Sequence, residues 1–517
     1  MNGAQALIRT LVDSGVDTCF ANPGTSEMHF VAALEHVPEM RAVLGLFEGV
    51  VSGAADGYGR MADRPAATLL HLGSGLGNGL ANLHNAHRAG VPLVNIVGEH
   101  ATYHIQYDAP LTSDIKSIAS GVSNWIRTPQ TPEQVPVAAA EAVAAAHGPP
   151  GDVVTLILPA DTSWGEGAEP HAPLATAAPA VVDDSTVADV AKLLGSDSQS
   201  AILIGGSALD DEGLRAASRI ANMTGTRLLA ETFPARLSRG AGRVPIDRLG
   251  YLPEFVAVQL QGVENLITVQ ARSPVSFFAY PGKDSDLVPD GTAVHSLAGT
   301  GDDGIDALAR VADLLGAAEG TETIQGESRP DLPQGPLSAE TIAAAVGALL
   351  PENAIVSDES NTASLPLPAM TQGAAAHDWL TLTGGAIGQG MPVATGAAVA
   401  CPDRQVLNLE SDGSAMYTIQ SLYTQARESL DVTTIVYNNR AYSILNLELS
   451  RVGAEQNERA KAMFDLSRPN LNFVEIARGM GVPGVRVETA QELCTALENA
   501  FVEDGPHLVD AIVPPII

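Results

Sequence analysis

Two polar side chains follow consecutive apolar runs late in the sequence, and their chemical types suit a site for a metal ion and a phosphate. The run VLNLE is followed by the turn SDGS, which holds Asp412, and the run VTTIVY is followed by two asparagines that end at Asn439. We expect both runs to be buried parallel strands, joined by a helix that opens near Met416. The carboxyl ends of two such strands lie close together in a right-handed crossover, which brings Asp412 near Asn439.

Carboxylate and amide oxygens are hard ligands that suit Mg²⁺, an ion that also takes phosphate oxygens. Backbone N–H groups in the turn and at the start of the helix favour a phosphate at the same place. Asp-Gly and Asn-Asn are each common in ordinary turns. Because both follow apolar strands, and because Asp412 and Asn439 are 27 positions apart, we interpret them together as a cradle for Mg²⁺ and a diphosphate.

Glu48 is the second candidate for chemistry, because small and apolar residues surround it in AVLGLFEGVVSGAADGYGRM. We expect it at a junction between a strand and a helix. A buried carboxylate is costly unless it has a partner. Burial also favours the protonated form, so Glu48 could hold a proton near neutral pH and donate it. The structural alternative is a helix glutamate that reaches solvent or pairs with Arg60.

The segment from VLNLESDGS to VTTIVYNN resembles the thiamine-diphosphate signature of the enzyme family that includes acetolactate synthase, pyruvate decarboxylase and benzoylformate decarboxylase. The resemblance extends over the whole chain. It implies that Asp412 and Asn439 hold Mg²⁺ by their side chains, that Ala441 adds its backbone carbonyl, and that Ser414 contacts the diphosphate. The family form begins Gly-Asp-Gly, and here Ser411 replaces the first Gly, so we expect a small backbone adjustment there.

Further cofactor contacts follow from the same resemblance. The loop TGGAIGQGMP resembles the one that presses on the cofactor, with Ile387 as the bulky wedge between the two thiamine rings and the Gly385 carbonyl accepting from the 4′-amino group. In DESNTAS, Asn361 and Thr362 match positions that bind the diphosphate, and Gly413 lies in the matching turn. The structural alternative for each segment is a plain Gly-rich or polar turn.

The substrate side of the site is implied by the first segment of the chain. The turn in ANPGTSEMHF resembles the Asn-Pro-Gly-Ser turn of benzoylformate decarboxylase, which places Thr25 at the substrate carboxylate and Ser26 beside it. His71, at the end of AATLLH, matches an active-site histidine that can carry protons near neutral pH. Glu48 matches the glutamate beside N1′ of the aminopyrimidine. A turn that caps a helix and a structural histidine are the alternatives for the first two.

Two departures from the family narrow the reaction. Benzoylformate decarboxylase has a second active-site histidine where SPVSFFAYPG has none, which favours carboligation or another proton donor. Leu445 stands where pyruvate decarboxylases place a catalytic glutamate, which argues against a simple pyruvate decarboxylase. The resemblance instead places Ile444, Leu445 and Glu448 along the substrate pocket.

The function implied is thiamine-diphosphate- and Mg²⁺-dependent decarboxylation, carboligation or both, acting on a small-molecule 2-oxo acid with an aldehyde or oxo acid as acceptor. One alternative is an acetolactate synthase-like chain that joins pyruvate to a second 2-oxo acid. We expect no FAD, because ARLSRGAGRVPIDRLG occupies the place of the flavin motif. A non-catalytic cofactor-binding homologue is the alternative from another class. The resemblance also implies a homodimer or homotetramer, with the cofactor between the first domain of one chain and the last domain of its neighbour.

The elements that must position these residues alternate between strands and helices. Stretches near 165–183 and 317–336 lack apolar periodicity and carry helix breakers, so we interpret them as linkers. We expect an α/β fold of three doubly wound parallel-sheet domains: pyrimidine-binding over 1–165, middle over 184–318, and diphosphate- and Mg²⁺-binding over 336–517. Ligands bind at the carboxyl ends of strands in such sheets, which is where the candidates lie.

The composition excludes several partners. The net charge is −32, whereas nucleic acid and anionic membranes attract Lys and Arg. No stretch is long and apolar enough to span a bilayer, and the N-terminus has no signal-peptide pattern, so we expect a cytoplasmic protein. Cys19, Cys401 and Cys494 form no CxxC pair, and we expect buried thiols.

Overall fold

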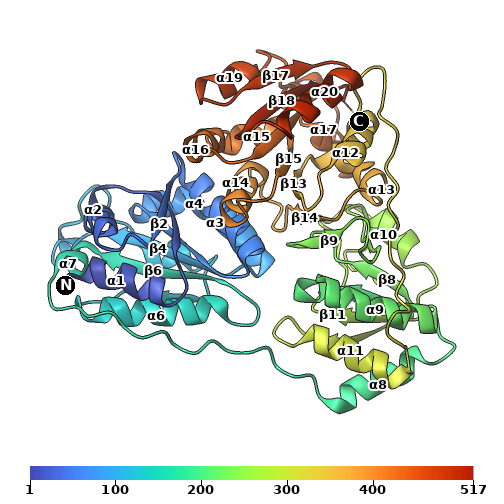
Figure 1. Ribbon diagram of the computed structural model, residues 1–517, viewed down its shortest axis with the longest axis horizontal. Helices are drawn as coiled ribbons and strands as arrows, with labels where there is room; N and C mark the ends of the chain where they lie inside the picture. The colour runs from blue at the N-terminus through green and yellow to red at the C-terminus, as the bar shows by residue number, and fades with distance from the viewer. Residues whose placement is uncertain (516–517) are drawn as a thin grey trace.

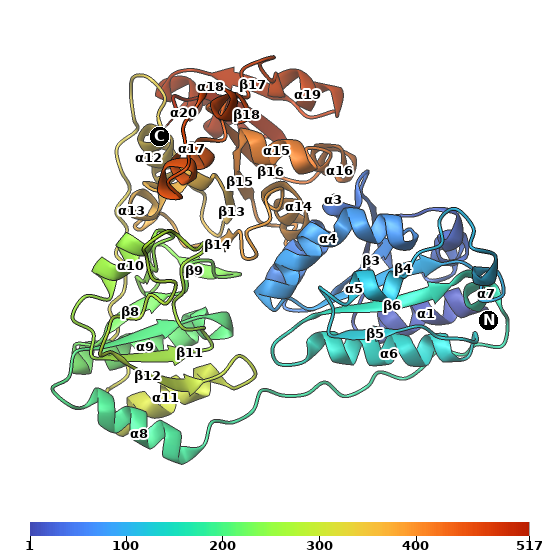
Figure 2. The same ribbon diagram turned by 180° about the vertical axis from the view of Figure 1, so that it is seen from behind.

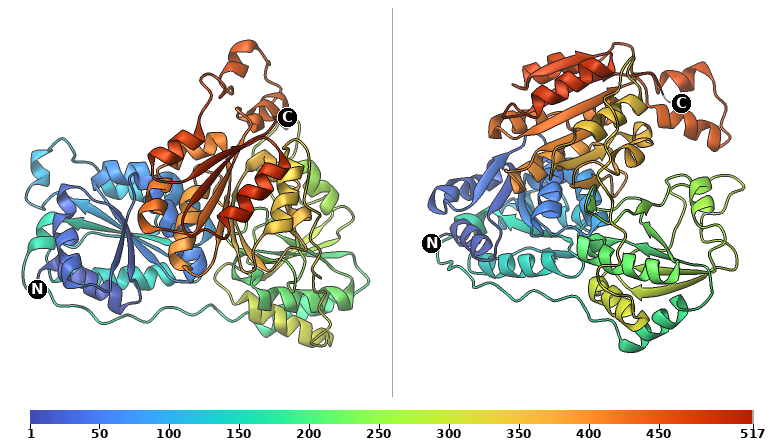
Figure 3. Two further views of the ribbon diagram at one scale, coloured as in Figure 1. Left: turned by 45° about the horizontal axis from the view of Figure 1, so that its top comes forward. Right: turned by 45° about the vertical axis from the view of Figure 1, so that its right-hand side comes forward.

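Three β-sheets, each with helices packed against it, follow one another along the chain in the computed structural model, which describes residues 1–515 (Figure 1). In both views of Figure 3 the elements of the last sheet, in orange and red, border the first sheet and the middle sheet. The predicted α/β class with three mainly parallel sheets is confirmed. The predicted domain boundaries stay a prediction, and residues 516–517 of the last range lie outside the described residues.

The first sheet has six strands in the order β2-β1-β3-β4-β6-β5, and every pair in it is parallel. Its central strands are buried because helices cover both faces. The strands are β1 (Thr18–Asn22), β2 (Arg41–Leu44), β3 (Ala66–Leu70), β4 (Leu93–Glu99), β5 (Trp125–Arg127) and β6 (Val153–Pro159). The helices are α1 (Gly3–Asp13), η1 (Thr25–Glu27), α2 (Met28–Ala33), η2 (Leu34–His36), α3 (Glu48–Ala62), α4 (Leu72–Ala89), η3 (Ile105–Tyr107), α5 (Ile115–Ala119), α6 (Gln134–His147) and α7 (Ala160–Trp164).

The middle sheet has five parallel strands in the order β10-β8-β7-β11-β12. An extended segment over 165–183 leads into it and is visible as the long trace between α7 and α8 in Figures 1 and 2. The strands are β7 (Ser200–Ile204), β8 (Arg227–Ala230), β10 (Asp247–Arg248), β11 (Asn265–Val269) and β12 (Ala293–Ala298). The helices are α8 (Asp184–Leu194), η4 (Gly206–Leu209), α9 (Asp211–Thr224), α10 (Pro253–Gln259) and α11 (Gly304–Leu315).

The last sheet has seven strands in the order β17-β18-β16-β15-β13-β14-β9. Its strands are β9 (Leu237–Arg239), β13 (Ile355–Glu359), β14 (His377–Thr381), β15 (Val406–Ser411), β16 (Val432–Asn438), β17 (Gly484–Val487) and β18 (His507–Ile512). Its helices are α12 (Ala339–Leu349), η5 (Asn361–Ser364), α13 (Leu367–Thr371), α14 (Gly390–Ala400), α15 (Asp412–Thr418), α16 (Ser421–Glu428), α17 (Ser443–Arg451), α18 (Glu458–Ala462), α19 (Phe473–Gly479) and α20 (Ala490–Ala500).

Strand β9 is a departure from the all-parallel expectation. It comes from the middle segment of the chain, yet it pairs antiparallel with β14 of the last sheet, with His377 opposite Arg239. This short strand covers the hydrogen-bonding edge of β14, which would otherwise be exposed. The last sheet is therefore completed by a piece of the middle segment.

Helices α3 and α14 join the first sheet to the last through close backbone contact (Figure 2). A Cβ built on Gly57 of α3 would lie 2.1 Å from the carbonyl oxygen of Val393, and one on Gly396 of α14 would lie 1.8 Å from that of Ala54. No side chain fits in either place, so both glycines are required for this approach.

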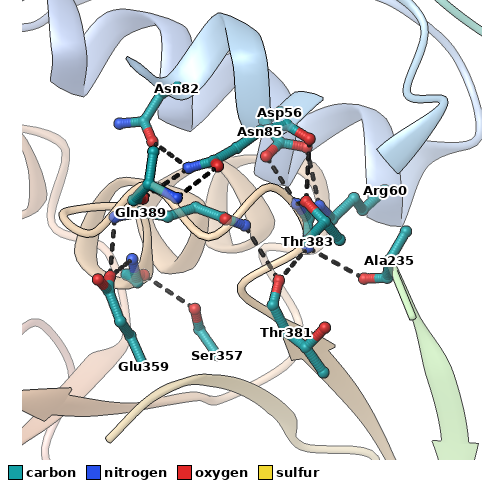
Figure 4. Close-up of polar contacts among 12 residues, drawn as sticks. Asp56, Arg60, Asn82, Asn85, Ala235, Ser357, Glu359, Thr381, Thr383 and Gln389 are labelled. Carbon is teal, nitrogen blue, oxygen red and sulfur yellow. Dashed lines mark hydrogen bonds and ion pairs between the residues drawn. The ribbon is translucent and has the colours of Figure 1, made fainter. Parts of the chain in front are cut away.

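Arg60 of α3 fastens this contact to the rest of the molecule (Figure 4). Its guanidinium forms a fully buried ion pair with Asp56, with Nη2 at 2.8 Å from Oδ2. It also donates to the carbonyl oxygens of Thr381 at 2.8 Å and Ala235 at 3.2 Å, and to the hydroxyl of Thr383 at 3.0 Å. Arg60 therefore links the first segment of the chain to the middle and last segments by hydrogen bonds.

None of the helices in residues 1–515 combines the length and apolar character needed to cross a membrane. All three cysteines are free thiols. Burial of Cys19 and Cys494 confirms the expectation for those two, whereas Cys401 is partly exposed. Burial raises the pKa of the Cys19 thiol to about 12.

Candidate active site

Glu48 and His71 converge at the carboxyl edge of the first sheet. Glu48 is the first residue of α3, and His71 directly precedes α4. A Cβ built on Gly75, in the first turn of α4, would lie 3.2 Å from Glu48 Oε1 and 3.5 Å from His71 Cβ. The missing side chain at Gly75 therefore leaves the space that both groups border.

The carboxyl group of Glu48 is buried and has a neutral partner. Its side chain accepts from Nδ2 of Asn78 at 3.0 Å, and the residue is 8% exposed. No ion pair involves Glu48 in the described part of the chain. Arg60 bonds to Asp56 instead, so the structural alternative of a Glu48–Arg60 pair is wrong.

Glu27 is a site residue that the sequence analysis did not find. Its Oε2 accepts from the backbone N–H of Gly24 at 2.7 Å and lies 2.8 Å from Nδ1 of His71. Its Oε1 fits against Gly98, where an added Cβ would lie only 1.6 Å away. Burial raises the pKa of Glu27, and the charge of His71 opposes that shift.

Thr25 and Ser26 form the start of η1 beside the same histidine. The ring of His71 packs on the Gly24 backbone, where an added Cβ would lie 2.4 Å from the ring. Thr25 is exposed and Ser26 is half-buried. The structure therefore brings the predicted substrate-side residues together with Glu27 at one edge of the first sheet.

Asp412 begins α15, so the helix starts four residues earlier than the predicted start at Met416. Asp412, Gly413 and Ser414 thus belong to the first turn of the helix, and Ser411 is its N-cap residue rather than part of a preceding turn. Asp412 Oδ1 accepts from Gly413 N at 2.8 Å, and Oδ2 accepts from Arg440 N at 2.6 Å. The second bond joins the ends of β15 and β16, as the spacing predicts.

The oxygens at this edge can hold a divalent cation. Burial raises the pKa of Asp412 to about 6, and backbone N–H groups offset part of that shift. Asn439 Oδ1 accepts from Ala441 N at 2.9 Å, which places the amide beside the Ala441 backbone. Residues 1–515 contain no cluster of three His, Cys, Asp or Glu side chains that could hold a metal. A carboxylate with amide and carbonyl oxygens fits Mg²⁺ better than zinc or copper.

Two of the predicted diphosphate residues contact each other. Asn361 Nδ2 donates to Ser414 Oγ at 3.1 Å and to Ser411 Oγ at 3.0 Å. Asn361 and Thr362 lie in η5, directly after β13, and Gly413 lies in the first turn of α15. The ends of β13 and β15 therefore form one polar cradle.

The Gly-rich loop before α14 is held from two sides (Figure 4). The carboxylate of Glu359, in β13, accepts from the backbone N–H groups of Gly388 at 2.7 Å and Gln389 at 2.8 Å, and from that of Gly390. On the other side Asn85 of α4 exchanges hydrogen bonds with the backbone of Ala386 at 2.8 and 3.1 Å. These bonds fix the loop that carries the next two predicted residues.

Within that loop, Gly385 has φ +75° and Ile387 is half-buried. Burial raises the pKa of Glu359 to about 7, although the loop N–H groups favour its ionised form. A positive φ at Gly385 suits a residue without a side chain.

Aromatic residues of the middle segment lie against the loop and α17. A Cβ built on Gly385 would lie 2.5 Å from the ring of Phe277. Tyr280 donates its hydroxyl to Glu448 Oε1 of α17 at 3.0 Å. Ile444 and Leu445 lie on the same helix, with Leu445 exposed. The SPVSFFAYPG stretch therefore meets both the loop and the helix predicted to line the substrate pocket.

Two groups of candidate residues emerge, and they come from different sheets. In residues 1–515 no hydrogen bond or ion pair joins Glu48 or His71 to Asp412 or Asn439. The loop carbonyl of Gly388 links the two sides, because it accepts from Asn82 of α4 and Thr418 of α15.

Comparison with protein families matches both ends of the chain. Residues 1–120 match the N-terminal thiamine pyrophosphate-binding domain of thiamine pyrophosphate enzymes, and residues 369–511 match the C-terminal thiamine pyrophosphate-binding domain. These ranges contain the candidate residues of the first and last sheets, apart from Asn361 and Thr362.

Relatives of known name align over almost the whole chain. A Mycobacterium tuberculosis protein provisionally named an acetolactate synthase large subunit is 59% identical over 520 residues, covering 100% of both chains. Benzoylformate decarboxylase of Pseudomonas aeruginosa is 31% identical and covers 96% of each. The structure of Rhodococcus jostii 4-hydroxybenzoylformate decarboxylase has the same fold, with a TM-score of 0.87 at 24% identity over 99% of both chains.

Proposed function

Because the chain belongs to the family of thiamine pyrophosphate enzymes, we propose that it cleaves the bond between the carbonyl carbon and the carboxylate of a 2-oxo acid and releases carbon dioxide. The remaining fragment then takes a proton or is joined to a second carbonyl compound. The observation that carries this proposal is the convergence of Glu48 and His71 on Gly75. Such a reaction needs groups that give and take protons beside the reacting carbon.

The residues present fit the cofactor of this family. Thiamine diphosphate, when bound, supplies a nucleophilic carbon and an electron sink for the bond cleavage. Asp412, Asn439 and the Ala441 carbonyl would hold Mg²⁺ through oxygen atoms, which the burial of Asp412 at the meeting point of β15 and β16 supports. The diphosphate would lie against Asn361 and Ser414, together with Thr362 and Gly413. Gly385 and Ile387 would contact the thiamine rings.

Glu48 would hydrogen-bond to N1′ of the aminopyrimidine ring and hold the proton there. Asn78 supports this role, because its amide donates to Oε2 and leaves Oε1 directed at the space beside Gly75. A carboxyl group with a neutral partner can change its protonation state more readily than one in an ion pair.

His71 would move protons at the substrate. Its Nδ1 faces the buried Oε2 of Glu27. With Glu27 ionised, Nδ1 would carry a proton and Nε2 would be the atom free to accept or donate one. The Thr25 hydroxyl, with Ser26 beside it, would bind the substrate carboxylate. Its exposure at the start of η1 supports access by a ligand.

The middle segment favours a substrate with a large apolar side chain. The ring of Phe277 lies 5.8 Å from that of Phe233, 5.3 Å from that of Tyr251 and 5.0 Å from that of Phe278, measured between centroids. Phe277 touches Gly385 and remains 42% exposed. Such a cluster suits an aromatic group by edge and face contacts. We therefore propose an aromatic 2-oxo acid, as in the relative named benzoylformate decarboxylase.

A second candidate is the joining of pyruvate to another 2-oxo acid. The relative at 59% identity, provisionally named an acetolactate synthase large subunit, supports it. In either case we propose a homodimer or homotetramer, as the resemblance to the family implies. The part of the chain that the structure describes has no direct bond between Glu48 or His71 and Asp412 or Asn439, and a site shared by two chains would accommodate this.

The test is carbon dioxide release from pyruvate, 2-oxobutyrate, branched-chain oxo acids and benzoylformate, with thiamine diphosphate and Mg²⁺, with and without an acceptor aldehyde. We expect release that requires both cofactors and is fastest with benzoylformate. A strong rise with acceptor would mark a carboligase, and preference for pyruvate with a second oxo acid would favour the second candidate. No release from any acid would contradict the proposal and turn attention to the non-catalytic alternative.

A further inference from the structure

Ser411 stands where the family signature has glycine, and its hydroxyl bridges two strands of the last sheet. It accepts from Asn361 Nδ2 at 3.0 Å and donates to the carbonyl oxygen of Glu359 at 3.0 Å. Glu359 ends β13, and Ser411 ends β15. A glycine at this position would leave both groups without that partner.

The hydroxyl is not used in the way that its position in the helix favours. Ser411 is the N-cap residue of α15, with φ −79° and ψ 145°. A serine there usually accepts from a backbone N–H in the first helical turn. No such bond forms here, because the side chain points across the sheet to Asn361 and Glu359.

Asn361 needs this support. Its φ of +50° lies in the left-handed region, which asparagine adopts more readily than most residues, so contacts of its side chain set the exact orientation of the amide. Both protons of its amide nitrogen are used, one by Ser411 and one by Ser414. Without the Ser411 hydroxyl, the Asn361 amide would keep only one of its two hydrogen bonds, the one to Ser414.

The same network fixes the direction of the Ser414 hydroxyl. Ser414 accepts from Asn361, so its single proton must point elsewhere. The Ser414 hydroxyl is also near enough to the Glu359 carboxylate to lower its pKa slightly against the effect of burial. A phosphate oxygen placed over the turn is an equivalent acceptor for that proton.

We propose that Ser411 is a positioning residue for the diphosphate, coupling the Asn361 turn to the turn that carries Ser414. In this role it acts through Asn361 and the end of β13 rather than by binding the cofactor itself. Its role is to hold the Asn361 turn and the Ser414 turn in a fixed relative position. A glycine has no hydroxyl and cannot perform this role. This inference rests on the proposed binding of thiamine diphosphate at these turns.

The test is cofactor binding to the full chain stripped of metal and cofactor. Thiamine diphosphate with Mg²⁺ would be titrated by calorimetry into the wild type and into Ser411→Gly, Ser411→Ala and Ser411→Thr. We expect Kd to rise about tenfold in the Gly and Ala variants, which corresponds to the loss of one hydrogen bond to a buried polar group. Ser411→Thr keeps the hydroxyl and should bind within about twofold of the wild type.

Ser218→Ala is the matched control. Ser218 is a buried serine of α9 in the middle segment, and its hydroxyl accepts from Thr323 N at 2.9 Å. This variant should lower the thermal midpoint without changing Kd. Unchanged Kd in Ser411→Ala and Ser411→Gly, or equal weakening in Ser411→Thr, would overturn the proposal. A wild type that binds no cofactor would overturn the proposed function and this inference with it.

Discussion

The Glu27–His71 pair gives the site a titratable ring with a fixed orientation. Glu27 is 1% exposed and holds His71 Nδ1 at 2.8 Å, while its other bond goes to the backbone of Gly24. A carboxylate in this position selects the tautomer with the proton on Nδ1. The residue therefore acts through His71, as a positioning residue.

Glu27→Gln should lower kcat/KM by about 10- to 100-fold while cofactor affinity stays unchanged. In the wild type one atom, Glu27 Oε2, faces both Gly24 N and His71 Nδ1. A glutamine oxygen in that position still accepts from Gly24, but it carries no full negative charge, so the protonated ring of His71 loses its charged partner. The measurement is the pH profile of kcat/KM together with the Kd for thiamine diphosphate. Glu35→Gln, at an exposed residue of η2, is the matched control. An unaltered pH profile in Glu27→Gln would contradict the assignment.

The ring of Phe277 should favour aromatic over small 2-oxo acids, because it belongs to the aromatic cluster that we propose lines the substrate pocket. Phe277→Ala should raise KM for benzoylformate about tenfold and leave KM for pyruvate within about twofold, because only the larger acid loses a ring contact. The measurement is steady-state kinetics with both acids. Phe255→Ala removes another exposed phenylalanine of the middle segment, in α10, and should change neither. An equal effect on both acids would count against an aromatic pocket.

Among single residues, the sequence predicted those that directly follow strands. Asp412 and Asn439 were predictable because each comes after an apolar run, and parallel strands end at a common edge. Glu27 was not predictable from local pattern. Its burial depends on the missing side chain of Gly98, which lies more than seventy positions later at the end of β4. The network of Ser411 likewise depends on contact between two strands rather than on spacing.

Among the elements, helices α3 and α14 show what periodicity cannot reveal. Small and apolar residues around Glu48 indicated that the α3 segment is buried, and alternation of strands with helices predicted three parallel sheets. The partner of each helix was not predictable, because Gly57 and Gly396 act through contact with a backbone far away in the sequence. The same holds for β9, whose three residues carry no alternation and which pairs outside its own segment.

Strand β14 begins with a buried histidine that links pH to stability. Burial lowers the pKa of His377 to about 4, its Nδ1 lies 2.7 Å from the Ala375 carbonyl, and its Nε2 is buried without a partner. In the unfolded chain a histidine titrates near pH ~6.5. The neutral ring therefore contributes stability that is fully present above about 6.5 and is lost as the pH falls through about 4.

His377→Asn should flatten this dependence, because asparagine keeps a donor near the Nδ1 position and takes up no proton. Between pH ~7.5 and ~4.5 the wild type should lose on the order of 2 to 3 kcal/mol more than the variant. The measurement is the thermal midpoint across that range. His36→Asn, at an exposed residue of η2, should follow the wild type. Parallel curves for His377→Asn and the wild type would show that the ring does not carry this linkage.

At the scale of the whole molecule, the positions of the two groups of candidate residues raise the question of whether the site lies within one chain or between two copies. Glu48 and His71 lie at the edge of the first sheet, and Asp412 and Asn439 lie at the edge of the last sheet. Within residues 1–515 the Gly388 carbonyl, in the loop before α14, accepts from Asn82 on one side and from Thr418 on the other. A cofactor that must reach Glu48 and Asp412 together can do so inside one chain or between two copies related by a two-fold axis.

Mixing two inactive variants separates these arrangements. Glu48→Gln removes the proton-holding group of the first sheet, and Asp412→Asn removes the cation-binding carboxylate of the last sheet, so each alone should lose almost all activity. If the site lies between two copies, a mixed dimer holds one site with neither change and one with both. Random pairing after co-expression then restores about one quarter of the wild-type activity.

If the site lies within one chain, every copy in the mixture carries one defect and no activity returns. Co-expression with two different affinity tags, followed by purification of the mixed species, raises the expected recovery to about one half, because each mixed dimer has one intact site of two. The control is Glu48→Gln mixed with a second inactive variant of the same edge, His71→Ala, which should not complement because both changes act in the first sheet and every between-copy site receives one of them. Recovery in the first mixture and none in the second would identify the first sheet of one copy and the last sheet of the other as the two halves of the site.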